Sequence, residues 1–412
     1  MSHLTPVNPS HGLVDVPGFR VGVTACDIRN KGNDRLDLTL LASDRPAAAA
    51  AVFTRNRFAA APVLHGRRLL AGGRPVRAIV ANSGNANACT GQEGMADTET
   101  MAAHTASALG CEDHEVFVCS TGRIGERLPM ERIKAGIARA ATGLSDAPEA
   151  GCKAADAILT SDTRRKVVTV RTQIGGRTVT VAGIAKGAGM IQPDMATMLA
   201  FIATDASIPA PDLQSFLTTA VGPTFNAVTV DGDTSTNDTV LLLANHMSGV
   251  TLESAADRAA FAEALLHVCD DLARKIVGDG EKITKVVDLR VEGAATQADA
   301  EKVARTIGNS LLVKSSWFGG DPNWGRLLDA AGYAGVDFDP DRVVLDYLPC
   351  EKGDPVPVFA KGQAIHANKP LWKALVAAPQ FGIRLHLGGG EATFRLLASD
   401  LTDGYVNFNK SE

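Results

Sequence analysis

The sequence predicts an α/β protein, and three observations lead to that prediction. Segments with strand-like and helix-like patterns alternate along all 412 residues. Hydrophobic residues make up 45% of the chain and charged residues 21%, a balance typical of globular proteins that excludes wholesale disorder. The 40 glycines and the aromatic content of only 5% indicate many turns and a core filled by small side chains. A prior of about 150 residues per domain gives two or three domains.

The N-terminal part is expected to begin with three strands, at residues 36–42, 50–54 and 76–81. The third strand runs into Asn-Ser-Gly-Asn-Ala-Asn at 82–87, which we expect to be a polar loop because Asn and Gly favour turns. A helix is predicted over 95–109, ending at Gly110. The strand at 116–118 is then expected to give way to a loop containing Thr121 and Gly122.

The pattern continues in the second half of the chain. Alternating residues on both sides of Gly175 and Gly176 predict a β-hairpin, with strands at 166–170 and 177–181. Apolar residues at helical spacing predict a helix within 251–276, stopped by Gly278. A strand at 286–291 and an amphipathic helix around 298–307 follow. Candidate domain boundaries lie at residues 143–151, 208–212 and 292–293.

Charge and cysteine content exclude several classes of protein. A net charge of −5 gives no electrostatic footprint for nucleic acid or an anionic membrane. The seven scattered cysteines form no C-x-x-C pair, so neither a disulfide framework nor a zinc site is predicted, and a reducing cytosol fits best. No signal peptide is predicted, and the apolar runs are far shorter than the ~18 residues of a membrane span. We therefore expect a cytoplasmic protein without nucleic-acid or membrane partners.

Two glycine clusters begin like a dinucleotide-binding fingerprint but do not complete it. Gly187-Ala188-Gly189 and Gly278-Asp279-Gly280 both lack the third Gly and the strand–loop–helix context that such a site needs. The P-loop, H-E-x-x-H and G-x-S-x-G motifs do not occur either. We expect neither a metal nor a redox cofactor.

The segment from Lys186 to Thr197 suggests a chemistry. A Gly/Pro/Asp-rich stretch runs into Ala196, and Thr197 then opens a strongly apolar strand. A hydroxyl nucleophile at neutral pH needs a base beside it, and an N-terminal Thr supplies one from its own α-amine. Cleavage between Ala196 and Thr197 would create that arrangement. For an isolated Thr at the start of a strand, β-propensity alone is the better explanation.

A family resemblance changes that balance. The run KGAGMIQPDMATMLAFIATDA (186–206) resembles the processing-site signature of the ornithine acetyltransferase (glutamate N-acetyltransferase) family, bifunctional acetyltransferases of arginine biosynthesis. Seven further blocks agree with the family in order, so the resemblance covers essentially the whole chain. They are ANSGNANACTG (81–91), STGRIGERLPM (120–130), ILTSDTRRK (158–166), FNAVTVDGDTSTNDT (225–239), GDGEKITK (278–285), NSLLVKSSWFGGDPNWGR (309–326) and SDLTDGYVNFN (399–409).

The resemblance implies the catalytic roles. Thr197 would be the autoprocessing residue, released from Ala196, and then the nucleophile that carries the acyl group as an ester. Thr121 and Gly122 match the oxyanion-hole pair of the family, where the loss of one donor typically costs about 2.7–4 kcal/mol of barrier. Without the family match, Thr-Gly would be an ordinary turn.

The resemblance also implies the substrate contacts, to which Thr197 itself belongs. Lys186 and Thr163 fall at substrate-binding positions, with Thr160 as the alternative if the alignment shifts by a turn. Glu281 matches an acid that pairs with a substrate ammonium, and Asn409 matches a C-terminal substrate contact. In isolation, Lys186 and Glu281 would more simply be solvated surface charges. The NSGNANA and DPNWGR segments are interpreted as scaffold.

The chain departs from the family pattern near the substrate pocket. Gln192 and Asp194 stand where the family has His and Asn. Lys282 follows Glu281 in a block that is usually E-G-A-T-K, which places a second ammonium beside the acid. The sequence also stops short of the terminal Ser or Thr that the family uses as a last substrate ligand. The nucleophile and the oxyanion pair are intact, whereas the acceptor pocket is altered.

The implied fold is a four-layer α/β/β/α sandwich of the N-terminal-nucleophile type at 1–290, followed by a smaller α/β domain at 291–412. Cleavage would give fragments 1–196 and 197–412, expected to stay associated as a heterotetramer with two copies of each.

The implied reaction moves acetyl from N²-acetylornithine to glutamate through acetyl-Thr197. Acetyl-CoA would be a second donor if the enzyme is bifunctional. Two alternatives remain open. One is a related enzyme with another acyl acceptor, or an amidohydrolase that uses water; the other is a non-catalytic binding protein that is never cleaved.

Overall fold

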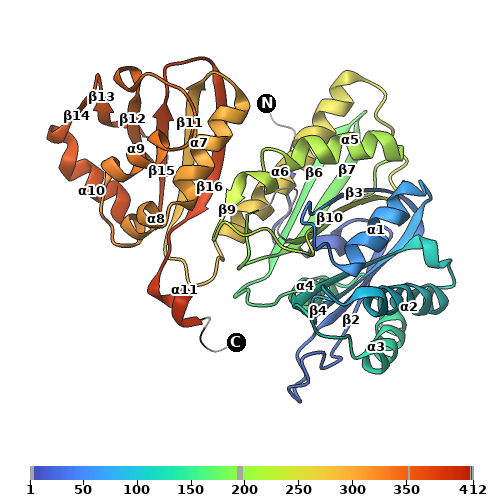
Figure 1. The fold of residues 1–412 in the computed structure, drawn as a ribbon. Helices are drawn as coiled ribbons and strands as arrows, with labels where there is room; N and C mark the ends of the chain where they lie inside the picture. Colours follow the sequence, from blue (N-terminus) through green and yellow to red (C-terminus); the bar gives the residue numbers. More distant parts are fainter. Residues whose placement is uncertain (1–3, 193–197, 351–352, 409, 411–412) are drawn as a thin grey trace. The chain divides into compact units, whose positions relative to one another are not determined.

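Residues 4–192, 198–350, 353–408 and 410 are described by the computed structural model, which is mixed α/β (Figure 1). The chain divides into two units. The first comprises Met1–Gly187, Pro193–Asn226 and Thr234–Ile276; the second comprises Ala188–Gln192, Ala227–Asp233 and Val277–Glu412. The boundary expected at 290–291 falls within a strand of the second unit, β11 (Val286–Ala294).

The first unit is built on one sheet. Its strands are β1 (Thr5–Pro6), β2 (Phe19–Thr24), β3 (Leu38–Phe53), β4 (Val76–Asn85), β5 (Val116–Arg123), β6 (Lys166–Ile174), β7 (Arg177–Lys186), β8 (Leu199–Thr204) and β10 (Thr239–Ala244). Its helices are α1 (Ala61–Ala71), α2 (Gly91–Leu109), α3 (Met130–Thr142), α4 (Pro148–Ala157), α5 (Ala210–Val221) and α6 (Ala255–Val277). Among the described residues the strand order is β1-β6-β7-β8-β10-β3-β4-β5, and β2 also pairs with β3.

Strand β3 folds this sheet into two layers. Its first half, 38–42, pairs with β2 and β4, whereas its second half, 48–53, pairs with β10. The register shifts between the halves, where residues 44–46 are exposed and Pro46 has no N–H to donate to a ladder. The two strands expected here are therefore one, because the polar residues between them form an irregularity and not a turn.

The two layers share an apolar core. Ile79 of β4 and Phe117 of β5 meet Ile184 of β7 and Phe201 of β8 there. Because successive strand residues point to opposite faces, Val80 of β4 faces the other way, into a second core formed with α2 and α3. Helices α2 and α3 therefore cover the outside of one layer.

Helices α5 and α6 cover the outside of the other layer. A Cβ on Gly183 of β7 would lie 2.9 Å from Leu272 and 3.2 Å from Val268, so α6 packs directly on the strand. Gln214 of α5 hydrogen bonds to both the N and the O of Ala51 in β3, each at 3.0 Å. Figure 1 shows both helices lying along β6 and β7. The expected α/β/β/α sandwich is confirmed.

Two strands are longer than the sequence predicts. β4 continues to Asn85 and β5 to Arg123, and the two run parallel, with Thr121 opposite Ser83. The expected loops at the ends of β4 and β5 are therefore wrong. Turn propensity is overridden because a buried side-chain hydrogen bond links the two strands, from Ser120 Oγ to Asn82 Oδ1 at 2.6 Å.

Other expected elements are confirmed. Helix α2 ends at Gly110 in a left-handed conformation with φ 66°. The β6–β7 hairpin turns at Gly175 and Gly176, whose φ angles of 56° and 75° suit a two-residue turn that glycine favours. Helix α6 ends directly before Gly278.

The second unit packs helices on one face of a separate sheet. Its strands are β9 (Val228–Thr229), β11, β12 (Val344–Pro349), β13 (Val356–Ala360), β14 (Gln363–Ala364), β15 (Gln380–His386) and β16 (Ala392–Ser399), in the order β14-β13-β12-β15-β11-β16-β9. Its helices are α7 (Gln297–Asn309), α8 (Leu311–Phe318), α9 (Trp324–Gly332), α10 (Lys369–Ala377) and α11 (Asp403–Phe408). Trp317, Leu327 and Trp372 bring α8, α9 and α10 into the core that lies against the sheet.

The DPNWGR segment serves this packing, as its interpretation as scaffold predicts. Asn323 caps α9 by accepting from the N of Arg326 at 3.3 Å, and Trp324 stacks on Phe359 with centroids 5.7 Å apart. All seven cysteines are free thiols. Within the described ranges no helix is long and apolar enough to cross a membrane, and no group of His, Cys, Asp or Glu could hold a metal.

Candidate active site

Thr121 and Gly122 lie at the end of β5, where backbone packing is unusually close. Gly122 pairs with Gly84 of β4 and has φ 136°, a conformation that L side chains rarely adopt. A Cβ at Gly122 would lie 2.2 Å from the carbonyl carbon of Gly84 and 2.4 Å from the N of Asn85. Thr121 is only 9% exposed. The backbone at this pair is therefore fixed in a conformation that only glycine permits.

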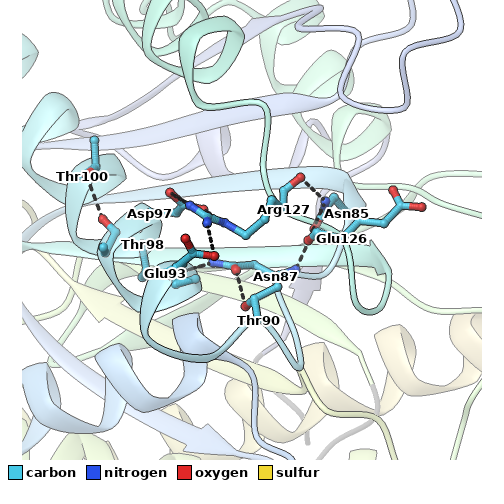
Figure 2. A network of polar contacts seen from close by, with 11 residues as sticks. Asn85, Asn87, Thr90, Glu93, Asp97, Thr98, Thr100, Glu126 and Arg127 are labelled. Carbon is cyan, nitrogen blue, oxygen red and sulfur yellow. Dashed lines mark hydrogen bonds and ion pairs between the residues drawn. The ribbon is translucent and has the colours of Figure 1, made fainter.

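Asparagine side chains hold the adjoining loop, as Figure 2 shows. Asn85 Nδ2 donates to the carbonyls of Glu126 and Arg127 at 3.2 and 3.1 Å. Asn87 Nδ2 donates to Thr98 Oγ1 at 2.9 Å. These amides bind backbone and side-chain groups of neighbouring segments, which supports the interpretation of NSGNANA as scaffold.

Arg127 ties the same loop to helix α2. Its guanidinium makes two hydrogen bonds of 2.9 Å to the two carboxylate oxygens of Asp97, which is nearly buried (Figure 2). Glu93 adds a second ion pair at 2.5 Å. This fork-like pairing fixes the geometry of both partners.

Asn237 binds Ser120, which precedes Thr121 and Gly122, and lies two residues before the partner of Met198 at the start of β8. Its Nδ2 donates to the carbonyl of Ser120 at 2.8 Å and to that of Ala86 at 2.6 Å. Two residues later, the N of Thr239 donates to the carbonyl of Met198 at 2.9 Å. Met198 directly follows Thr197 in the sequence, so a three-residue stretch, 237–239, joins the neighbour of Thr121 to the neighbour of the expected nucleophile.

Lys186 ends β7 and belongs to a buried ionic cluster. It pairs in register with Leu199 of β8, and its Nζ lies 3.9 Å from Asp162 Oδ2. Lys166 Nζ donates to Asp162 Oδ1 at 2.7 Å, and the side chains of this closer pair are fully buried. Burial alone would raise the pKa of Asp162, but Lys186 and Lys166 hold that pKa below its usual range. The carboxylate is thus ionised and fixes both ammonium groups.

Asp162 also organises the backbone around the predicted threonines. It accepts from the N of Gly187 at 2.6 Å and from the N of Thr160 at 3.0 Å. Thr163 is exposed and follows Asp162 directly in the chain. Arg35 Nη2 donates to the carbonyl of Thr160 at 3.2 Å, which holds this segment from the other side. The segment that carries Thr160 and Thr163 is therefore anchored to the end of β7.

Glu281 lies in the second unit, against the residues that follow Lys186 and Gly187. Its N donates to the carbonyl of Ala188 at 3.0 Å. A Cβ on Gly189 would lie 2.4 Å from Glu281 Oε1, so the acid covers this glycine. Lys282, where the family has Gly, has φ 54° and places its ammonium over the Phe408 ring at 5.4 Å. The left-handed backbone accounts for the family's glycine.

Three predicted residues, Ala196, Thr197 and Asn409, lie outside the described residues. In the first unit, Asp162 joins Lys186 to the backbone of Thr160, with Thr163 next to it in the chain, and Asn237 separately fixes Ser120 beside Thr121 and Gly122. Sequence reasoning missed Asp162, Lys166, Asn237 and Asp231. All four lie within blocks that match the family, and the i, i+4 spacing of Asp162 and Lys166 was a visible signal.

Comparisons with known proteins name the family. The family model for ArgJ matches residues 20–411. The "Arginine biosynthesis bifunctional protein ArgJ" of Symbiobacterium thermophilum is 48% identical over 406 residues, 97% of this chain and 98% of that protein. The protein of the same name from Geobacter sulfurreducens is 45% identical over 402 residues, 96% of this chain and 99% of its own length.

Among solved structures, the ornithine acetyltransferase of Mycobacterium tuberculosis complexed with ornithine is 40% identical; the match covers 47% of this chain and 99% of that one, with a TM-score of 0.43. An ArgJ from Bacillus halodurans is 37% identical, covers 47% of this chain and 98% of its own, and has a TM-score of 0.44. On the family match and the full-length relatives, this chain belongs to the ArgJ family.

Proposed function

We propose that this chain transfers acetyl from N²-acetylornithine to glutamate, with Thr197 as the nucleophile. Family membership supports an acetyl-transferring enzyme of arginine biosynthesis. The observation that carries the finer proposal is the link made by Asn237–Thr239, which ties Ser120, beside the oxyanion pair, to Met198, beside Thr197.

The proposed chemistry has two half-reactions. The α-amine of Thr197 takes the hydroxyl proton, and the hydroxyl oxygen attacks the acetyl carbonyl of N²-acetylornithine. The amide C–N bond breaks, ornithine leaves with the proton, and acetyl remains as an ester on Thr197. The amine of glutamate then attacks this ester and regenerates the hydroxyl. Backbone donors at Thr121 and Gly122 stabilise the oxyanion in both steps.

The substrate contacts follow from charge and position. Lys186 carries an ammonium that suits a substrate carboxylate, and Thr163 a hydroxyl that suits a carboxylate or amide. Glu281 suits the substrate ammonium, and Asn409 is proposed as a further contact. Acetyl-CoA would act as a second acetyl donor in a bifunctional enzyme.

The nucleophile is generated by cleavage of the Ala196–Thr197 bond. We expect fragments 1–196 and 197–412 to stay associated, because β8 pairs along its length with β7 from the first fragment and β10 from the second. Two copies of each would form the proposed cytoplasmic heterotetramer. Native mass spectrometry of the cleaved protein tests that stoichiometry.

The substitution Thr197→Ala tests the nucleophile, with Thr197→Ser as the matched control that keeps a hydroxyl. We expect the Ala variant to remain a single 43.0 kDa chain without acetyl exchange, and the Ser variant to retain cleavage. Cleavage and exchange by the Ala variant would refute the mechanism. Release of acetate and ornithine without N-acetylglutamate, from acetylornithine and glutamate, would identify an amidohydrolase, and an uncut wild-type chain would indicate a binding protein.

A further inference from the structure

The residues leading to the cleavage site are held by the backbone of a loop in the same unit. Five backbone groups of 188–192 are hydrogen bonded to residues of the second unit. Two of these bonds form a short ladder with the loop at 230–233: the N of Val230 donates to the carbonyl of Ile191 at 2.7 Å, and the N of Gln192 donates to that of Asp233 at 2.8 Å. Four residues separate Gln192 from Thr197.

Asp231, at the centre of this loop, accepts hydrogen bonds from two consecutive peptide N–H groups. Its Oδ2 accepts from the N of Met190 at 2.6 Å, and its Oδ1 accepts from the N of Ile191 at 2.8 Å. Met190 has φ 56°, which disfavours a residue with a Cβ, and its side chain is 41% exposed. That side chain is not buried, and the Asp231 carboxylate is the group that binds the N–H of the strained residue directly.

A second element of the unit reaches the same carboxylate. Tyr405, on the C-terminal helix α11, donates its hydroxyl proton to Asp231 Oδ2 at 3.3 Å. The N of Tyr405 donates in turn to Thr402 Oγ1, whose hydroxyl donates to the carbonyl of Lys282 beside Glu281. Asp231 thus couples the approach to the cleavage site with the C-terminal helix and the Glu281 loop.

We propose that Asp231 is a positioning residue for autoprocessing, which fixes the backbone of Met190 and Ile191 and so directs the chain into the Ala196–Thr197 bond. This proposal rests on the proposed function, because it requires cleavage at that bond. Asp231 takes no part in the bond-making steps. Tyr405 assists by holding the Asp231 carboxylate, so the C-terminal helix influences cleavage at a site more than 200 residues earlier in the sequence.

The test is the rate at which the newly translated 43.0 kDa chain is converted into its two fragments. Asp231→Asn keeps the size of the side chain but presents an amide donor to one of the two N–H groups. We expect cleavage to slow roughly tenfold to a hundredfold, the range for loss of one charge-assisted hydrogen bond. It is not abolished, because Ile191 is itself buried and holds its own position. Tyr405→Phe should slow cleavage several-fold.

Asp233→Asn is the matched control, because within the described residues Asp233 binds the segment through its backbone carbonyl and binds Asp231 through its backbone N, and the substitution keeps both groups. We expect it to be cut at the wild-type rate. In the uncut Thr197→Ala background, the midpoint of thermal unfolding of Asp231→Asn should stay within about 4 °C of that of its parent.

If the midpoint falls further, the cleavage rate of Tyr405→Phe becomes the test of the proposal. Equal cleavage rates for Asp231→Asn and Asp233→Asn, or unslowed cleavage of Tyr405→Phe in that case, overturn this inference alone. An uncut wild-type chain overturns the proposed function as well.

Discussion

Each of the two units fixes its own candidate site residues, and the two do so by different physical means. In the first unit, Asp162 is buried between two lysines and Gly122 is pressed against the backbone of β4. In the second unit, Asp231 is bound mainly by backbone N–H groups, and Gly189 is covered by the flexible end of Glu281. The first unit uses buried charge and close backbone contact, and the second uses hydrogen bonds that can adjust.

This difference has a chemical meaning. The proposed oxyanion donors at Thr121 and Gly122 and the Lys186 ammonium must be preorganised, because a donor that moves during the reaction stabilises the oxyanion less. The segment before Ala196 has another requirement, since the proposed cleavage would release one of its ends. Buried ionic contacts suit the first task, and hydrogen bonds that can be broken singly suit the second.

The largest effect is expected at Gly122, where the backbone of the first unit is most constrained. In Gly122→Ala the Cβ would lie 2.2 Å from the carbonyl carbon of Gly84, so the backbone must move. We expect acetyl exchange to fall roughly 100- to 1,000-fold, as for loss of one oxyanion donor. Gly125→Ala is the control, because it also has a positive φ, 90°, but no atom lies within 4 Å of the added Cβ. Equal activity of the two variants would contradict the role of this backbone.

The buried ionic cluster of the first unit is tested by Asp162→Asn, which removes the carboxylate that Lys166 and Lys186 share. Removing one partner of a buried ion pair costs about 3–5 kcal/mol, and we expect that loss in the free energy of unfolding, measured with urea. The control is Asp156→Asn. Asp156 lies in helix α4, and the substitution breaks its partly exposed ion pair with Arg165. That pair is worth about 1 kcal/mol or less. A similar cost for both would show that the buried cluster contributes nothing special.

The carboxyl groups of Asp162 and Asp231 are expected to take up protons in different pH ranges. Burial raises the pKa of Asp231, which faces the Tyr405 hydroxyl and the neighbouring Asp233, whereas Lys186 and Lys166 together lower the pKa of Asp162. The stability that Asp162 contributes is therefore present above the ordinary carboxyl pKa of about 3.9 and is lost only below it. Asp231 has the opposite sign: its contribution is largest below that value and is lost as pH rises through its folded pKa.

On acidification from neutral pH, Asp231 therefore takes up a proton before Asp162 does. We expect cleavage of the wild-type chain to slow as the pH falls, beginning above pH ~4, in a range where Asp162 is still ionised. The cleavage rate of Asp231→Asn should lack this component. The measurement is a pair of pH profiles, and profiles of the same shape would contradict the assignment.

The smallest effect is expected for Gly189→Ala. The added Cβ would lie 2.4 Å from Glu281 Oε1, but a carboxylate at the end of a side chain can move where a backbone cannot. We expect about 1–2 kcal/mol of lost stability, typical of overpacking, and a higher KM for the substrate whose ammonium Glu281 is proposed to bind. A loss of kcat as large as that of Gly122→Ala would erase the contrast between the two units.

Local signals in the sequence predicted much of the fold. The Gly175-Gly176 turn, the stop of α2 at Gly110 and the alternation of apolar residues depend on neighbours in the chain, so they could be recognised directly. The ends of β4 and β5 could not. Asn and Gly favour turns locally, and only partners distant in sequence, such as Asn237 for Ser120, keep the strands paired.

The candidate site shows the same division. The family match identified Thr121, Gly122 and Lys186, whose motifs are contiguous in the sequence. The residues that hold them were missed, because Asp162 meets Lys186 and Gly187 only after β6 and β7 pair. Asp231 likewise lies in a block that matches the family, but its hydrogen bond to Met190 joins two residues that are 41 positions apart in the sequence.

The mass of the C-terminal fragment after incubation with N²-acetylornithine is the most direct test of Thr197 as the carrier of the acetyl group. We expect fragment 197–412 to gain one acetyl group on Thr197, glutamate to remove it, and N-acetylglutamate to appear in equal amount. A cleaved, active enzyme whose C-terminal fragment is never acetylated, or is acetylated at another residue, would contradict it.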